Sequence, residues 1–148
     1  MVGRKPHPKE FFTPEEKGLI VEAIREAERG TSGEIRVYLE RRGRGEIMGR
    51  AKKVFRKLGM TRTKNRDGVL IYFSLSQHAF AVVGDEAIYA KAGDKFWKAS
   101  AAGMEAHFTR GTFSGGLIQG IREIGQVLKR YFPREPGDVN ELSNEVAE

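Results

Sequence analysis

The sequence contains no cysteine, and this absence removes several kinds of chemistry at once. Disulfides, thiol nucleophiles and cysteine-ligated zinc are all excluded. The sequence also lacks an apolar run approaching the roughly 20 residues that a membrane-spanning helix needs. Its first residues carry cations but have neither the apolar core nor the small-residue cleavage site of a secretory signal. We therefore expect a cytoplasmic protein without a membrane span.

The length of 148 residues is typical of one domain with a real hydrophobic core. Local composition divides the chain into an N-terminal arm (1–12), a domain (13–133) and an acidic C-terminal tail (134–148). The tail holds five acidic residues against Arg134, although the whole chain carries a net charge of +6. Such an acidic segment without aromatic residues is typical of a mobile tail or a loosely docked extension.

Apolar spacing predicts four helices and three strands in an α/β arrangement. The helices are expected to start near Thr13, Ile47, Asp94 and Ser114, with Thr13, Asp94 and Ser114 as N-caps. The strands are expected at 33–40, 69–75 and 78–83. The middle strand is apolar without alternation, which indicates that helices cover it on both faces. The third strand follows too closely for a crossover helix, so we expect it to return antiparallel.

This topology predicts that four acidic side chains lie at one end of the sheet. The first two strands should be parallel, so their starts lie beside the end of the third strand. The acids there are Glu34, Asp67, Asp85 and Glu86. Converging carboxylates without sulfur ligands are what Ca²⁺ or Mg²⁺ requires. The alternative is that these acids are simply solvated at the ends of their strands.

Glycines stand beside three of these acids, at Gly33, Gly68 and Gly84. Glycine is expected where the backbone turns tightly and offers its carbonyls as further ligands. These positions therefore agree with a cation site at the strand ends.

The segment 41–66 is strongly basic, with eleven cations against Glu46 alone. Such a segment would attract nucleic acid, anionic lipid or an acidic protein segment. Nucleic acid is the less favoured partner, because no aromatic residues interleave the charge. A charged, solvated helix face is the simpler interpretation. The acidic tail could also fold back onto this segment, within one chain or from a neighbour, so we expect a monomer or a weak oligomer.

Several fragments together resemble the TPM domain family over roughly residues 11–133. They are "TSGEIRVYLE", "AKKVFRKLGMTRTKNRDGVLIYFSL", "AVVGDEAI", "FW", "GTFSGGLIQGI" and "YFP". The "NELSNEV" tail is similar to the ending of soluble bacterial members. The resemblance implies a three-layer α/β/α sandwich around a small mixed sheet, and a divalent-cation site as in some members. Asp85 matches a recurrent Gly-Asp position, whereas Glu86 stands where many members carry glycine.

The resemblance and the residues leave three functional hypotheses. The first is a cation-binding domain that acts as an interaction or protein-maintenance module, with an unknown protein partner. The second is a metal-dependent acid phosphatase acting on phosphomonoesters, an activity claimed for plant members of the family. Its phosphate would be held by candidate anion-binding residues, namely Lys64, Arg66, Lys53 and Arg56. The third is chaperone-like protection, or binding of an anionic partner, through the basic segment 41–66.

Overall fold

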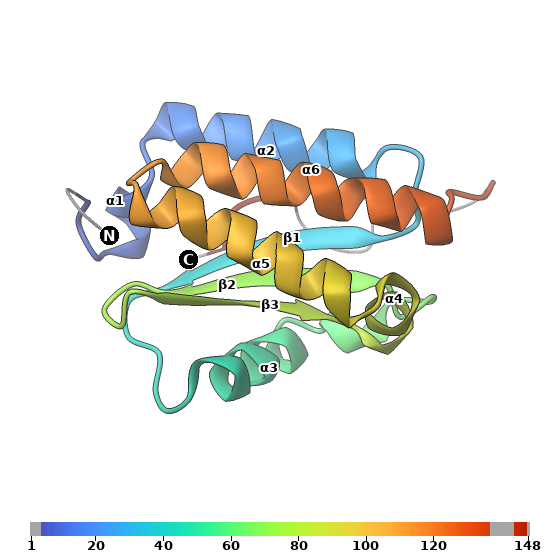
Figure 1. Cartoon of the computed structure of the whole chain (residues 1–148), viewed down its shortest axis with the longest axis horizontal. Helices are drawn as coiled ribbons and strands as arrows, with labels where there is room; N and C mark the ends of the chain where they lie inside the picture. The colour runs from blue at the N-terminus through green and yellow to red at the C-terminus, as the bar shows by residue number, and fades with distance from the viewer. Residues whose placement is uncertain (1–3, 137–143, 148) are drawn as a thin grey trace.

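The computed structural model describes residues 4–136 and 144–147. These residues form six α-helices, one short 3-10 helix and three strands (Figure 1). No helix within these ranges is long and apolar enough to span a membrane. In chain order the elements are α1 (Pro8–Phe11), α2 (Pro14–Glu28), β1 (Glu34–Glu40), α3 (Ile47–Lys57), η1 (Met60–Arg62), β2 (Gly68–Ser74), β3 (Ala79–Gly84), α4 (Glu86–Ala92), α5 (Asp94–Thr109) and α6 (Phe113–Tyr131).

The three strands form one mixed sheet with β2 in the centre. β1 pairs with β2 in parallel, and β3 pairs with β2 antiparallel. All seven residues of β2 are buried, which agrees with its uninterrupted apolar sequence. The predicted strand directions are therefore confirmed.

Helices cover both faces of the sheet and make three layers. On one face, α2, α5 and α6 share an apolar core with strand residues such as Val37 and Ile71. On the other face, Val54 and Phe55 of α3 belong to a second core with Tyr72. Figure 1 shows α3 on the opposite side of the sheet from α2 and α6. The expected α/β/α sandwich around a small mixed sheet is confirmed.

The helix starts confirm one predicted cap and correct two. Thr13 caps α2 and forms a capping box with Glu16, with hydrogen bonds of 3.0 and 3.1 Å. Ser114 is not an N-cap, because α6 begins one residue earlier and the Ser114 hydroxyl bonds to Glu16 instead. Asp94 is the first residue of α5, and its carboxylate accepts a hydrogen bond of 2.7 Å from the Tyr89 hydroxyl. At both corrected positions the side chain bonds to a residue of another helix and not to a backbone N–H of its own helix.

Segments near both ends of the chain contact the main body of the fold. Phe11 and Phe12 are buried in the main core. Arg4 donates two hydrogen bonds of 2.7 Å to Glu16. Near the other end, Ala147 pairs in parallel with β1 and adds a short fourth segment beside that strand. Residues 137–143 of the predicted acidic tail lie outside the described residues, so the role of the tail stays a prediction.

Candidate metal site

Strand pairing brings the three segments with the predicted acids to one end of the sheet, which we call the acidic end (Glu34, Asp67, Asp85 and Glu86). Glu34 opens β1, and its backbone N–H donates to the carbonyl of Asp67 at 3.4 Å. Asp85 directly follows β3, and its N–H donates to the carbonyl of Gly68 at 2.9 Å. The register that the strand directions predicted therefore places these acids in neighbouring segments.

Three of the four acids at the acidic end are buried. Asp67, Glu34 and Asp85 are 1%, 2% and 5% exposed, respectively. Asp67 accepts a hydrogen bond of 2.7 Å from the Ser32 hydroxyl, which itself accepts one from the Asn65 amide at 3.0 Å. Carboxylates at this depth are costly unless hydrogen bonds and positive charge compensate them.

Arg66 holds Asp85 in a bidentate ion pair. The Nε and Nη2 atoms of Arg66 donate to the two oxygens of Asp85 at 2.8 and 2.9 Å. Nη2 also lies 3.2 Å from Oε1 of Glu86, whose side chain is 71% exposed. The hydrogen bond to Asp85 raises the pKa of Arg66 above its ordinary value. Asp85 further accepts from the Glu86 N–H at 2.8 Å and so caps α4.

The backbone of Arg66 has a φ of 52°, in the left-handed region that few non-glycine residues adopt. Arg66 lies two residues before β2, and its guanidinium reaches Asp85. Nothing in the alternation of apolar residues could have revealed this pairing. The sequence singled out Arg66 for phosphate binding, whereas the structure sets it against a carboxylate.

The oxygen donors of the acidic end suit Ca²⁺ or Mg²⁺, but their present arrangement is that of an ion pair. Within residues 4–136 and 144–147, no three acidic or histidine side chains are gathered closely enough to hold a metal ion. Both oxygens of Asp85 accept from Arg66. A cation could therefore use Asp85 only after Arg66 has moved away.

Two of the three glycines beside these acids, Gly33 and Gly84, serve close packing and not the tight turns that the sequence predicted. None of Gly33, Gly68 and Gly84 has a positive φ. A Cβ on Gly84 would lie 2.9 Å from the Trp97 ring, and one on Gly33 would collide with the side chain of Leu128. Glycine is required at Gly33 and Gly84 because helices approach the strands closely there.

The remaining candidate anion-binding residues lie apart from the ion pair. Lys53 and Arg56 are exposed on α3, and Lys64 is exposed in the segment that leads into β2. Among the described residues, none of these three forms an ion pair with the acidic end. Of the four candidate anion-binding residues, Arg66 is thus the one that contacts the acidic end.

Sequence reasoning missed Glu28, a buried acid beside the start of β1. It is 8% exposed, and its Oε2 accepts a hydrogen bond of 2.9 Å from the backbone N–H of Ile35. Burial is the main cause that raises the pKa of Glu28 to about 7, although the bond to Ile35 and the charge of Arg134 act in the opposite direction. Its position in the last turn of α2 gave no signal of this role.

A small mixed sheet between helices, with acids at one end, defines a class of α/β/α domains, and the comparisons with known proteins place the chain within it. The model of the TPM domain matches residues 7–127. The chain therefore belongs to the TPM domain family. None of the curated proteins matches the chain.

Solved structures agree with this assignment. The chain is similar to the BA42 protein of the psychrophilic bacterium Bizionia argentinensis, with 40% identity over 97% of this chain and 99% of that one, and a TM-score of 0.87. The N-terminal domain of a P. gingivalis protein shares the fold at 21% identity, over 84% of this chain and 82% of that one, with a TM-score of 0.66. The N-terminal domain of cg2496 from Corynebacterium glutamicum does so at 10% identity, over 79% and 74%, with a TM-score of 0.60.

Proposed function

We propose that this TPM domain binds a divalent cation, Ca²⁺ or Mg²⁺, at the acidic end, and that it acts as an interaction or protein-maintenance module. The observation that supports the proposal is the strand register, which sets buried carboxylates from three segments at one end of the sheet. Buried carboxylates that lie close together repel one another, which raises the free energy of keeping each one ionised. A divalent cation between them lowers that free energy for all of them.

Arg66 supplies part of this positive charge in the metal-free protein. Its side chain is 41% exposed, so it can leave Asp85 for solvent without disturbing the core. We expect the cation to replace the guanidinium at Asp85 and to draw in Asp67 and Glu34 as further ligands, since these side chains are not gathered closely enough for a metal ion while the ion pair is in place. The exposed Glu86 would then add a carboxylate from the solvent side.

Titration of the ¹⁵N-labelled chain with CaCl₂ and with MgCl₂ tests the proposal by amide resonance shifts. We expect the largest shifts at residues 34, 67 and 85 and at Arg66. Asp85→Asn and Asp67→Asn should each weaken binding by about tenfold or more, because each removes a charged ligand. Glu22→Gln is the matched control, since Glu22 is an exposed acid on α2 that pairs only with Arg25 among the described residues. Shifts that gather away from the acidic end would contradict the proposal.

Phosphomonoester hydrolysis and chaperone-like protection stay predictions from the sequence. No contact among the described residues favours phosphomonoester hydrolysis, and none favours chaperone-like protection.

A further inference from the structure

The outer edge of β3 is open, in contrast to the outer edge of β1. Ala147 covers β1 through two backbone hydrogen bonds, one with Val37 at 2.8 Å and one with Leu39 at 2.9 Å. β3 pairs only with β2 among the described strands. The fold therefore already accepts an added segment at one edge and leaves the other edge available.

The strand register identifies which backbone groups of β3 face outward. The N–H of Asp85 bonds to Gly68, so alternate residues of β3 use their backbone groups toward β2. The backbone groups of Val82 and Gly84 then point away from the sheet. Within residues 4–136 and 144–147, no backbone partner for these outward groups is found. Unpaired edge groups of this kind are a template for strand addition.

A groove of about 510 Å³ runs along this outer edge. Its floor is Val82 to Gly84, and its two walls come from opposite sides of the sheet. Met48 and Lys52 of α3 form one wall, and Glu86 and Tyr89 of α4 form the other. Tyr89 is held in place by stacking on Trp97, with ring centroids 6.0 Å apart, and by its hydrogen bond to Asp94. The groove thus has one wall that carries the cation Lys52 and one that carries the aromatic ring of Tyr89 beside the acid Glu86.

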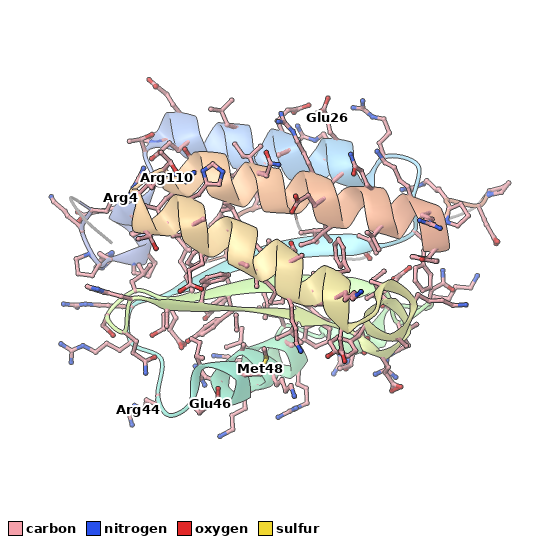
Figure 2. All side chains as sticks on the ribbon, in the orientation of Figure 1. Arg4, Glu26, Arg44, Glu46, Met48 and Arg110 are labelled. Atoms are coloured by element: carbon pink, nitrogen blue, oxygen red, sulfur yellow. The ribbon has the colours of Figure 1, made fainter. Side chains whose placement is uncertain are left out.

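The charge around the α3 wall favours an acidic occupant. Figure 2 shows Arg44, Glu46 and Met48 on α3 and the loop before it, on the side of the sheet away from α2. Nine exposed cations lie on this loop, on α3 and on the segment that follows, and none forms an ion pair with a described acid. They are Arg41, Arg42, Arg44, Lys52, Lys53, Arg56, Lys57, Arg62 and Lys64. Lys52 lines the groove itself, and the other eight give the segment that carries α3 a strong positive charge.

We propose that the outer edge of β3 binds an extended, acidic segment of a partner protein as an added strand. The segment gains backbone hydrogen bonds from Val82 and Gly84. Because side chains alternate along a strand, every second residue points toward Lys52 and the others toward Tyr89. The partner sequence therefore alternates acidic residues with apolar ones. This gives the interaction module of the proposed function a class of partner, but it does not depend on cation binding.

The test uses the acetylated and amidated peptide Glu-Val-Glu-Val-Glu-Ile-Glu as a probe of the full ¹⁵N-labelled chain. EDTA is present throughout, so that failure here is distinguishable from failure of cation binding. We expect the peptide to shift the amides of Val82 and Gly84 and to slow their exchange with solvent. The charge-reversed peptide Lys-Val-Lys-Val-Lys-Ile-Lys should bind about tenfold more weakly, and so should the Lys52→Glu variant.

A backbone variant separates strand addition from simple charge attraction. Val82→Pro removes the outward N–H, and proline is tolerated on an edge strand when its nitrogen faces solvent. We expect it to weaken binding by about tenfold, from one lost hydrogen bond and the added ring. Val82→Thr is the matched control, because it keeps the N–H and the branched shape. Amide spectra of both variants report whether the sheet is intact.

Three results would each overturn the proposal. The first is equal binding by Val82→Thr and a folded Val82→Pro variant. The second is a set of shifts confined to the cations of α3. The third is self-association of the chain through β3, seen as slower tumbling at higher concentration, because the occupant would then be a second copy.

Discussion

Glu40 and Asp85 lie at opposite ends of the sheet, and each carboxylate pairs with an arginine. Glu40 ends β1 and accepts two hydrogen bonds from Arg50, at 2.9 and 2.5 Å, and one from the Tyr72 hydroxyl at 2.5 Å. Asp85 follows β3 and accepts two from Arg66 at 2.8 and 2.9 Å. The two pairs have the same bidentate chemistry, so their surroundings decide what each can do.

The difference lies in which partner is exposed and in what stands beside it. At Glu40, Arg50 is largely covered, and the ion pair together with the buried ring of Tyr72 forms a closed cluster. Arg50 lowers the pKa of Glu40, while burial and Glu40 raise that of Tyr72. At Asp85 the arginine is the exposed partner, and further buried carboxylates lie in the neighbouring segments. We therefore expect the first pair to stabilise the fold, and the second to give up Arg66 in exchange for the proposed metal cation.

The largest expected effect comes from Glu28, which makes the two ends of β1 respond oppositely to pH. Its pKa is raised to about 7 from an ordinary value of 4.5, so the folded chain binds an extra proton between these values. Protonated Glu28 therefore favours the folded chain relative to the ionised form. This contribution to stability is complete below about pH 4.5 and is lost as the pH rises through 7. Glutamine does not ionise, so Glu28→Gln should not lose this contribution. The free energy of unfolding of the variant, relative to that of the parent, should therefore rise by about 3 kcal/mol between about pH 5 and 8.

Urea unfolding of parent and variant across this pH range provides the measurement for Glu28. Glu26→Gln is the matched control, since Glu26 lies on the same helix and points into solvent (Figure 2). Parallel pH profiles for the parent and Glu28→Gln would show that Glu28 does not titrate in this range. Glu40 should behave in the opposite way, because its pKa is lowered in the folded chain. Its charged form stabilises the fold at a pH above the ordinary pKa of a glutamate, and this stabilisation is lost as the pH falls.

Sequence periodicity predicted the strands well because each one alternates or is wholly apolar. It missed α4 (Glu86–Ala92), a helix of seven residues that is too short for a periodic pattern to stand out. It also missed α1, where Phe11 and Phe12 enter the core directly before the strong cap at Thr13. Short elements are fixed mainly by tertiary packing, and a local pattern cannot report that packing.

The candidate site was predictable in its position and not in its partners. Strand directions alone placed Glu34, Asp67 and Asp85 at one end of the sheet. The pairing of Asp85 with Arg66 depends on a left-handed backbone conformation, and the role of Glu28 depends on its contact with β1. Both are tertiary features, which residue type and spacing do not encode.

A smaller effect is expected from breaking the locked pair. Glu40→Ala leaves Arg50 and the buried Tyr72 hydroxyl without their acceptor, so the free energy of unfolding should fall by about 2 kcal/mol. Glu22→Ala breaks an exposed pair with Arg25 and should change it by less than about 1 kcal/mol. Both losses should be the same with and without CaCl₂. If calcium changed the loss of unfolding free energy in Glu40→Ala, the Glu40 pair would also respond to the cation, and the proposed difference between the two ends of the sheet would be wrong.

The smallest effect on stability is expected from Arg66→Asn, which tests whether the second pair is exchangeable. Asparagine tolerates the left-handed backbone at this position, so the variant removes the guanidinium without adding strain. Without cation its melting temperature should fall only modestly, because Arg66 is the exposed partner and the buried Asp85 carboxylate keeps its hydrogen bond from the Glu86 N–H. With CaCl₂ it should rise above that of the parent under the same conditions, since calcium no longer competes with Arg66 for Asp85.

Calorimetric titration of parent and Arg66→Asn with calcium separates the two parts of this prediction. Tighter binding by the variant is expected, and the double variant Arg66→Asn/Asp85→Asn should lose that gain. Equal affinity in parent and Arg66→Asn would mean that the guanidinium does not compete, so the Asp85 pair would be as structural as the Glu40 pair. If neither protein gives a heat of calcium binding, the proposal of cation binding itself is contradicted. Because Asp85 also caps α4, the helix content of the double variant must be compared with that of the parent before the loss is assigned to the ligand.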